Sequence, residues 1–109
     1  MTVQDLSNKL DLKVFTMEHP EREICGAYCG DLLSWVMGRA EFDNAWFTIM
    51  SNQNVAAVAV MAELSCVILT EGVKPDPQLL EKAENEKINL LGTDLPTFEA
   101  AAAFSKISE

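Results

Sequence analysis

From Ala45 onward the chain repeats one hydrophobic pattern, in which a short apolar run is followed by a polar loop and then by a segment of helical length. The apolar runs predict strands, and the segments that follow predict helices. The run at 66–69 has no polar residue, as expected of a strand that is buried on both faces of a parallel sheet. The predicted strands are 45–50, 66–69 and 88–91, and the predicted helices are 55–64, 76–86 and 95–106.

Two of these helices need a further argument. The valines of 55–64 would also suit a strand, but its alanine and methionine content and the need for a crossover between two parallel strands favour a helix. Pro77 suits the first turn of the helix at 76–86, because the first helical N–H has no partner within the helix.

The N-terminal part is less regular. A helix is predicted at 2–10, where Thr2 and Asp5 have the spacing of a weak capping box. Period-two alternation predicts a strand at 12–16, and an extended segment is expected at 23–29. Asp31 is predicted to cap a short helix at 32–37.

Three successive strand–loop–helix units imply parallel strands joined by right-handed crossovers. The expected fold is therefore α/β: a three-layer α/β/α sandwich with a mostly parallel sheet built from repeated βα units. No change in composition marks a boundary along the 109 residues, so one domain is expected over 1–109.

Small polar residues recur where the predicted parallel strands end, and ligands of open parallel sheets bind at that edge. Backbone N–H groups there could hold a small polar or anionic metabolite. The same residue types also cap helices and close turns, so capping is the competing interpretation for each of them. Lys74 is the only cation close to these loops in the sequence. The candidate ligand-binding residues are Asp31, Thr48, Asn52, Asn54, Thr70, Gly72 and Thr93.

Composition and charge exclude several classes of function. The chain has 17 acidic and 8 basic residues, a formal net charge of −9 and a pI near 4.4. This acidity argues against binding nucleic acid or an anionic membrane surface. The N-terminus lacks the pattern of a signal peptide, and no apolar stretch approaches the ~20 residues of a spanning helix. With three cysteines, an odd number, the sequence predicts a cytoplasmic protein with reduced thiols.

Candidate chemistry is sparse. His19 is the single histidine, and neither a phosphate loop nor the glycine fingerprint for dinucleotides occurs, so no catalytic residue and no cofactor are predicted. Cys25 and Cys29 would come together with His19 around a metal only on a helix, and Gly26 favours an extended or turning backbone. Both cysteines are expected to be buried and structural, and no metal site is predicted.

The segment 35–47 is rich in large apolar side chains, with Trp35, Met37, Phe42 and Trp46. These residues are expected either to pack in the core or to anchor a protein interface, where tryptophan and methionine are enriched. The sequence leaves both interpretations open.

The stretch 66–104 resembles the C-terminal half of DRTGG domains. Its matching motifs are the Thr70-Glu-Gly72 turn after a strand, the Pro75-Asp76 loop that opens a helix, and Asp94-Leu-Pro-Thr97-Phe98. Upstream, Gly30-Asp-Leu-Leu-Ser34 and the segment 45–56 are similar to small stand-alone members, so the resemblance covers about 24–104. The pentapeptide Asp-Arg-Thr-Gly-Gly does not occur, and Glu71 stands where many relatives have glycine.

The resemblance implies a regulatory domain without catalytic residues. Similar domains accompany CBS-domain pyrophosphatases and phosphotransacetylases, and they resemble the N-terminal region of HPr kinase/phosphorylase. The implied fold is again a three-layer α/β/α domain. Relatives often self-associate, so the resemblance implies a homodimer.

Three functional hypotheses follow. The first is a non-catalytic regulatory or small-molecule-sensing domain that acts as a homodimer. The second is a protein-interaction module without a small-molecule ligand, which would meet a protein partner through the Trp35–Trp46 region or the acidic surface. The third is an enzyme, which has the least support because no nucleophile–base pair is evident.

Overall fold

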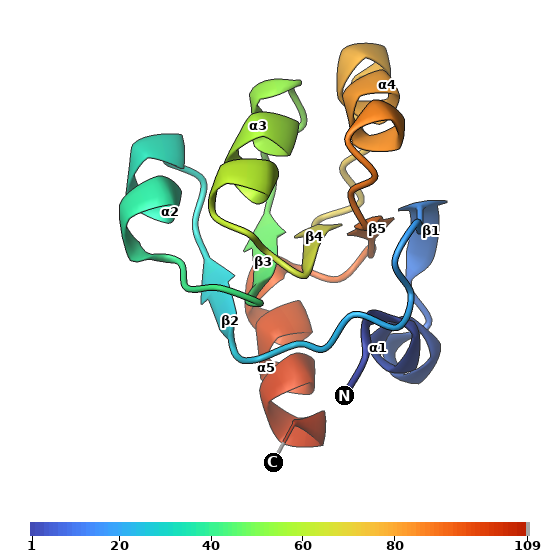
Figure 1. Cartoon of the computed structure of the whole chain (residues 1–109). Helices are drawn as coiled ribbons and strands as arrows, with labels where there is room; N and C mark the ends of the chain where they lie inside the picture. The colour runs from blue at the N-terminus through green and yellow to red at the C-terminus, as the bar shows by residue number, and fades with distance from the viewer. Residues whose placement is uncertain (109) are drawn as a thin grey trace.

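Within residues 1–108, which this computed structural model describes, five strands form one sheet (Figure 1). The strand order is β1-β5-β4-β3-β2. Neighbouring strands from β2 to β5 are parallel, and β1 is antiparallel to β5, with Lys13 opposite Gly92. The predicted mostly parallel sheet is therefore confirmed. The strands are β1 (Lys13–Thr16), β2 (Ala27–Cys29), β3 (Ala45–Thr48), β4 (Cys66–Leu69) and β5 (Leu90–Gly92).

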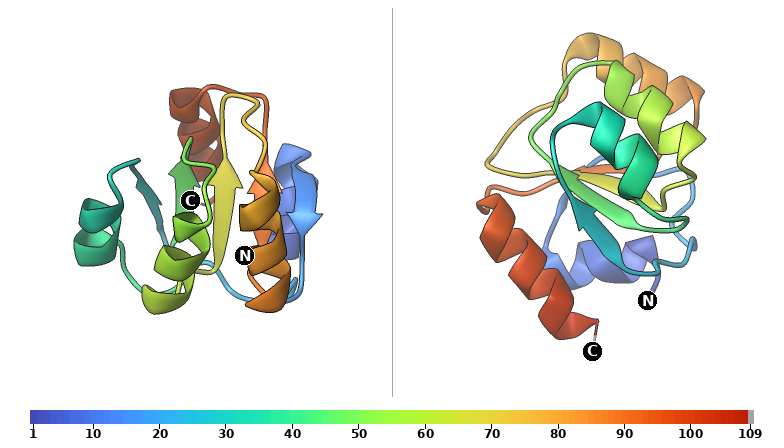
Figure 2. Two further views of the ribbon diagram at one scale, coloured as in Figure 1. Left: turned by 90° about the horizontal axis from the view of Figure 1, so that it is seen from above. Right: turned by 90° about the vertical axis from the view of Figure 1, so that its left-hand side faces the viewer.

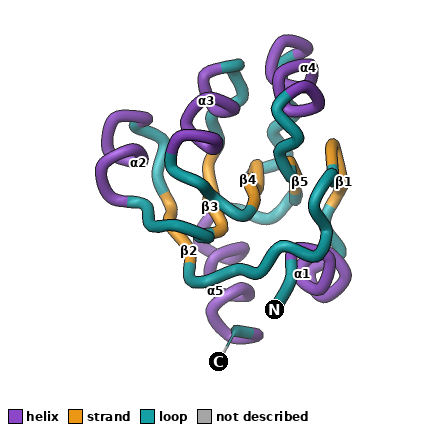
Figure 3. Tube along the Cα trace, viewed as in Figure 1, coloured by secondary structure: helices purple, strands orange, loops and turns teal. Residues whose placement is uncertain are grey.

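Helices cover both faces of this sheet (Figures 1 and 2). Figure 3 shows that they alternate with the strands from β2 onward, whereas the segment 17–26 between β1 and β2 is loop. One face carries α2, α3 and α4, and the other carries α1 and α5. The three-layer α/β/α architecture is thus confirmed. The helices are α1 (Val3–Leu10), α2 (Leu33–Arg39), α3 (Asn54–Met61), α4 (Pro77–Asn85) and α5 (Thr97–Ile107).

Alternation along the buried strands sends side chains into two separate cores. Trp46 of β3 and Leu69 of β4 pack beneath α2, α3 and α4. Phe47, the neighbour of Trp46, points to the opposite face and meets Phe104 of α5 edge to face, with ring centroids 5.8 Å apart. The continuous apolar runs of the sequence therefore reflect burial on both faces, as predicted for parallel strands.

The helix starts agree with the sequence at two places and differ at a third. The capping box of α1 is present: Thr2 Oγ1 accepts from Asp5 N at 3.1 Å, and Asp5 Oδ2 accepts from Thr2 N at 3.0 Å. These hydrogen bonds to the charged form hold the pKa of the Asp5 carboxyl below its ordinary value. Pro77 is the first residue of α4, as predicted.

The prediction that Asp31 caps the helix after β2 is wrong. The helix begins at Leu33, one residue later than expected, so Leu32 is the N-cap and no side chain caps it. Asp31 Oδ1 instead accepts from Thr48 Oγ1 at 2.8 Å and from Ile49 N at 3.0 Å. The physical reason is that the end of the neighbouring strand β3 presents two donors to this carboxylate.

No helix within residues 1–108 combines the length and the apolar character needed to span a membrane.

Candidate functional site

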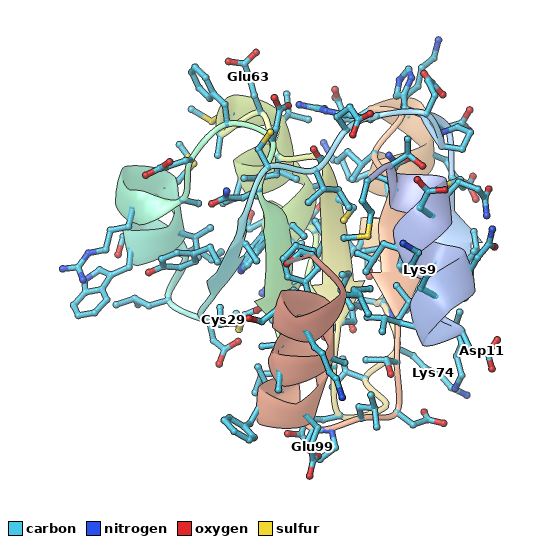
Figure 4. All side chains as sticks on the ribbon, turned by 90° about the horizontal axis from the view of Figure 1, so that it is seen from below. Lys9, Asp11, Cys29, Glu63, Lys74 and Glu99 are labelled. Carbon is cyan, nitrogen blue, oxygen red and sulfur yellow. The ribbon has the colours of Figure 1, made fainter. Side chains whose placement is uncertain are left out.

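The carboxyl ends of the parallel strands lie along one edge of the sheet, as the sequence predicted. We call this edge the strand-end rim and define it as residues 30–32, 48–54, 70–76 and 93–97. Figure 4 places Lys74 and Glu99 at this end of the sheet and Glu63 at the opposite end. Of the candidate residues, the rim brings Asp31, Thr48, Thr70, Gly72 and Thr93 onto adjacent strand ends.

Three threonines follow one another across the rim, and all three are buried. Thr48 donates its hydroxyl to Asp31, and its carbonyl accepts from Thr70 N at 3.0 Å. The hydroxyls of Thr70 and Thr97 lie 2.6 Å apart, which ties the end of β4 to the start of α5. Thr93 Oγ1 accepts from Leu95 N at 3.2 Å. These contacts match the capping and turn-closing interpretation, and ligand binding by these residues stays a prediction.

The turn after β4 holds Glu71 in a backbone conformation that favours glycine. Glu71 has a φ of 61°, in the left-handed region that disfavours side chains. Its carboxylate Oε2 accepts from Thr97 N at 3.2 Å and so satisfies a donor at the start of α5. Gly72 follows with a φ of 72°, and its N–H donates to Thr93 O at 3.0 Å. Glu71 thus adopts a strained backbone conformation, and its side chain caps the start of α5.

Asn52 and Asn54 lie in a separate part of the site. Asn52 Oδ1 accepts from Asn54 N at 2.9 Å, which supports the start of α3 although Gln53 is its N-cap residue. Asn54 lines a groove of about 280 Å³ between α3 and α4, whose lining also includes Ala57, Val60 and Lys82. This asparagine therefore faces a different space from the threonines of the rim.

The rim is hollowed where β1 and β5 meet. An open depression of about 460 Å³ lies beside a small pocket of about 30 Å³, and both are lined by Lys13, Thr93 and Asp94. Lys13 Nζ lies 3.1 Å from Asp94 Oδ1, and both side chains are exposed. Lys74 lines the small pocket. We call this region, defined by Lys13, Lys74, Gly72, Thr93 and Asp94, the two-lysine hollow.

Sequence reasoning found Lys74 but missed Lys13. The period-two pattern at 12–16 correctly predicts a strand, yet nothing in it shows that this strand pairs with β5. Gly92 allows the close approach of β1, since a Cβ there would lie 2.6 Å from the ring of Phe15. The pairing of β1 with β5, which are far apart in the sequence, brings Lys13 to the rim as the second cation.

The expectation that Cys25 and Cys29 are buried is wrong, because both thiols are exposed. The segment around β2 forms an edge of the sheet, and the helices leave it partly uncovered. Partial burial, followed by the nearby Asp31 carboxylate, raises the pKa of Cys29. Burial raises the pKa of Cys66 to about 12. Neither thiol is activated as a nucleophile.

His19 does not join Cys29. Its backbone N–H donates to Asn89 Oδ1 at 2.9 Å, just before β5 begins, whereas Cys29 ends β2. The two residues therefore lie at opposite ends of the sheet. In the part of the chain that the structure describes, no three His, Cys, Asp or Glu side chains gather as metal ligands would.

Burial makes the three thiols distinguishable by chemical labelling. We expect iodoacetamide at pH 8 to alkylate Cys25 and Cys29 in the folded protein and to leave Cys66 unmodified, because Cys66 is enclosed and its thiolate is disfavoured. Peptide mass spectrometry checks this, with protein unfolded in guanidinium as the control in which all three react. Equal labelling of Cys66 and Cys25 in the folded protein would contradict the burial.

The two tryptophans of the segment 35–47 differ in burial. Trp46 is completely buried and donates Nε1–H to Gly30 O at 2.8 Å, so the core interpretation holds for it. Trp35 is 52% exposed, and the Arg39 guanidinium stacks 3.8 Å from its ring centroid. Phe42 is 69% exposed. For Trp35 and Phe42 the interface interpretation stays a prediction.

Comparison with solved structures identifies a similar fold. A crystal structure of the CBS and DRTGG domains of the regulatory region of a Clostridium perfringens pyrophosphatase, complexed with the activator diadenosine tetraphosphate, superposes with a TM-score of 0.70 at 13% identity. The match covers 94% of this chain and 45% of that chain, so the present chain spans less than half of the matched region. A comparison with curated proteins found no match.

The sequence profile of the DRTGG domain matches residues 40–107, from the end of α2 to the end of α5. This range includes β3, β4 and β5 with the loops that follow them, and it contains most of the strand-end rim. The chain belongs to the DRTGG domain family.

Proposed function

We propose that this DRTGG domain is a non-catalytic regulatory domain that senses a small anionic metabolite at the two-lysine hollow and acts as a homodimer. The observation that carries the proposal is the convergence of Lys13 and Lys74 on the carboxyl ends of the strands. The chain has 8 basic residues against 17 acidic ones, and two of the basic residues line this one small pocket.

The architecture supports a regulatory role. The chain shares its fold with a regulatory region that is crystallised with a nucleotide activator. The family profile begins at residue 40, but β1 supplies Lys13 and β2 completes the sheet. We therefore propose that one DRTGG domain extends over the whole of 1–109.

The hollow offers an anion the positive charges of Lys13 and Lys74, and two carboxylates, Asp94 and Asp11, lie beside them. Lys13 forms an ion pair with Asp94, whose side chain is 77% exposed. Exposed ion pairs are weak, so an incoming phosphate or carboxylate can compete with Asp94 for Lys13. Lys74 adds a second positive charge at the small pocket, and the neighbouring depression of about 460 Å³, lined by Lys13, Asp11 and Asp94, has the size of a small-ligand site. The raised thiol pKa values and the separation of His19 from Cys29 support a binding role over a catalytic one.

Isothermal titration calorimetry with AMP, ATP, diadenosine tetraphosphate and pyrophosphate tests the ligand. We expect at least one of these anions to bind, and the double variant Lys13→Ala/Lys74→Ala to weaken its binding about tenfold or more, since each charge-assisted contact contributes ~1.5–3 kcal/mol. The control Lys9→Ala/Lys106→Ala removes the same charge from exposed positions on α1 and α5 and should bind as the parent does. Binding that survives in the first variant, or no binding by any of the four anions, counts against the proposal.

The exposed Trp35 and Phe42 favour a second candidate function, a protein-interaction module without a small-molecule ligand. Large exposed aromatic side chains are common anchors of protein interfaces. This alternative is supported if no anion binds and a protein partner recovered with the parent chain is lost with Trp35→Ala. It is excluded if the anion titration succeeds and Trp35→Ala leaves all partners bound.

A further inference from the structure

The two edges of the sheet differ in their protection against pairing with another strand. At the β1 edge, Lys13 presents a charge, and the pairing with β5 is irregular between Val14 and Thr16. Charges and bulges of this kind are among the means by which an edge strand resists strand addition, as is the short length of a strand such as β2, which has three residues. At the other edge, Ala27, Tyr28 and Cys29 carry no charge and no proline, and their register with β3 is regular.

The open edge of β2 presents unpaired main-chain groups. Toward β3, Ala45 N donates to Gly26 O at 3.0 Å, and Gly30 N donates to Phe47 O at 3.2 Å. Because alternate residues of a parallel strand point their N–H and C=O groups in opposite directions, the groups of Ala27 and Cys29 point away from β3. In the right-hand view of Figure 2, β2 faces the viewer, and α2 lies above it and farther out, as Figure 1 also shows.

On the side of the sheet that α5 covers, this edge exposes apolar residues, and Asp31 adds a carboxylate just beyond Cys29. Ala27 and Cys29 are exposed, and α5 packs against β2 and β3 on the same side of the sheet. The first turn of α5 exposes Phe98, and Ile49 is exposed directly after β3. Phe98 is the most exposed of the large apolar side chains, at 81%.

Charge restricts where two copies of this chain can meet. Each copy has a net charge of −9, so faces such as that of α4, with Glu81, Glu84 and the C-cap residue Glu86, repel one another. The uncharged β2 strand is a surface at which two such chains can approach closely. An exposed sheet edge is also self-complementary, because each copy offers the donors and acceptors that the other lacks.

We propose that a second copy of this chain docks at β2, antiparallel and across a two-fold axis, so that the two sheets become continuous. In the register that uses every outward main-chain group, Ala27 pairs with Cys29 of the partner subunit, and Tyr28 faces Tyr28 of the partner subunit. The exposed side chains of Ile49 and Phe98 lie on the side of the sheet where the two α5 helices then flank the new strand pair. This inference rests on the homodimer of the proposed function and specifies the interface of that dimer.

Analytical ultracentrifugation of matched edge variants tests the surface. We expect a dimer for the parent chain and for Val14→Lys, which adds a charge to the exposed β1 edge, and a folded monomer for Cys29→Lys. Ala27→Pro removes an N–H that β3 does not use and should also give a monomer. Circular dichroism verifies that each variant is folded. A parent dimer that persists in both β2 variants overturns this surface while leaving the homodimer in place.

Cross-linking gives a readout that does not depend on disrupting the strand. In a Cys25→Ser/Cys29→Ser background, Tyr28→Cys should form a covalent dimer on mild oxidation, because opposed non-hydrogen-bonded residues of antiparallel strands have Cα atoms about 4.5 Å apart, within disulfide range. Val14→Cys in the same background should stay uncoupled. A parent chain that sediments as a monomer and a Tyr28→Cys variant that does not cross-link would overturn both the surface and the homodimer, and anion binding would then be judged by calorimetry alone.

Discussion

Trp46→Ala is expected to lower the free energy of unfolding by about 3–5 kcal/mol, the cost of emptying a large buried aromatic site. Trp46 is fully buried between β3 and the layer of α2, α3 and α4, and its indole N–H satisfies Gly30 O. A domain of this size loses roughly 4–8 °C of melting temperature per kcal/mol, so a fall well above 10 °C should be measured by differential scanning calorimetry.

Trp35→Ala is the matched control for this substitution. Trp35 is half exposed, and its removal costs the stacking of Arg39, worth ~0.5–1 kcal/mol at an exposed site. Trp46→Phe keeps most of the buried ring and loses the hydrogen bond to Gly30, so it should fall between the two. Equal destabilisation by Trp46→Ala and Trp35→Ala would contradict the placement of the two side chains.

Asn89→Ala is expected to cost about 2–4 kcal/mol, because it removes three hydrogen bonds to main-chain groups of His19 and Ser65. Asn89 is 3% exposed. Its Oδ1 accepts from His19 N at 2.9 Å, and its Nδ2 donates to His19 O at 2.8 Å and to Ser65 O at 3.1 Å. The side chain thus fastens the long loop after β1 to the start of β4 and β5, and urea unfolding monitored by fluorescence measures its contribution.

Asn89→Asp separates the roles of donor and acceptor. The charged carboxylate cannot donate to His19 O or Ser65 O, and burial should raise its pKa in the folded state. With a raised pKa in the folded state, the variant keeps its full stability below the pKa of the unfolded carboxyl. It loses stability as the pH rises from that value through the pKa of the folded state. The variant should therefore be more damaging at pH 7 than at pH 4. Asn85→Ala, at an exposed position on α4, should change stability by less than about 0.5 kcal/mol, and a larger loss there would weaken the assignment to Asn89.

The repeated pattern after Ala45 was sufficient to predict the β3, β4 and β5 units, because parallel strands must be apolar on both faces and must be joined by crossovers. Sequence alone also predicted the capping box of α1 and the proline that begins α4. These features are local, and short-range sterics and hydrogen bonding decide them. Their confirmation follows from physics that acts within a few residues.

The errors and omissions arise where distant segments meet. The sequence assigns Asp31 to the helix that follows it, but the donors of Thr48, which ends β3, and of Ile49, which follows it, compete more effectively for its carboxylate. Cys25 and Cys29 were expected inside because no local signal marks β2 as the edge strand. Lys13 was missed because its neighbours Gly92 and Asp94 lie at the other end of the sequence.

The pairing of β1 with β5 also determines when the sheet can be completed during synthesis on the ribosome. The helices and strands from β2 to β4 can assemble as they emerge, since each parallel pair joins neighbours in the chain. Within this sheet β1 is translated first, yet β5, its one strand partner among residues 1–108, is translated last. Contacts of such long range form late and slow the completion of folding. A nascent chain stalled before Leu90 therefore exposes both β1 and the unpaired side of β4 to chaperones and to other nascent chains.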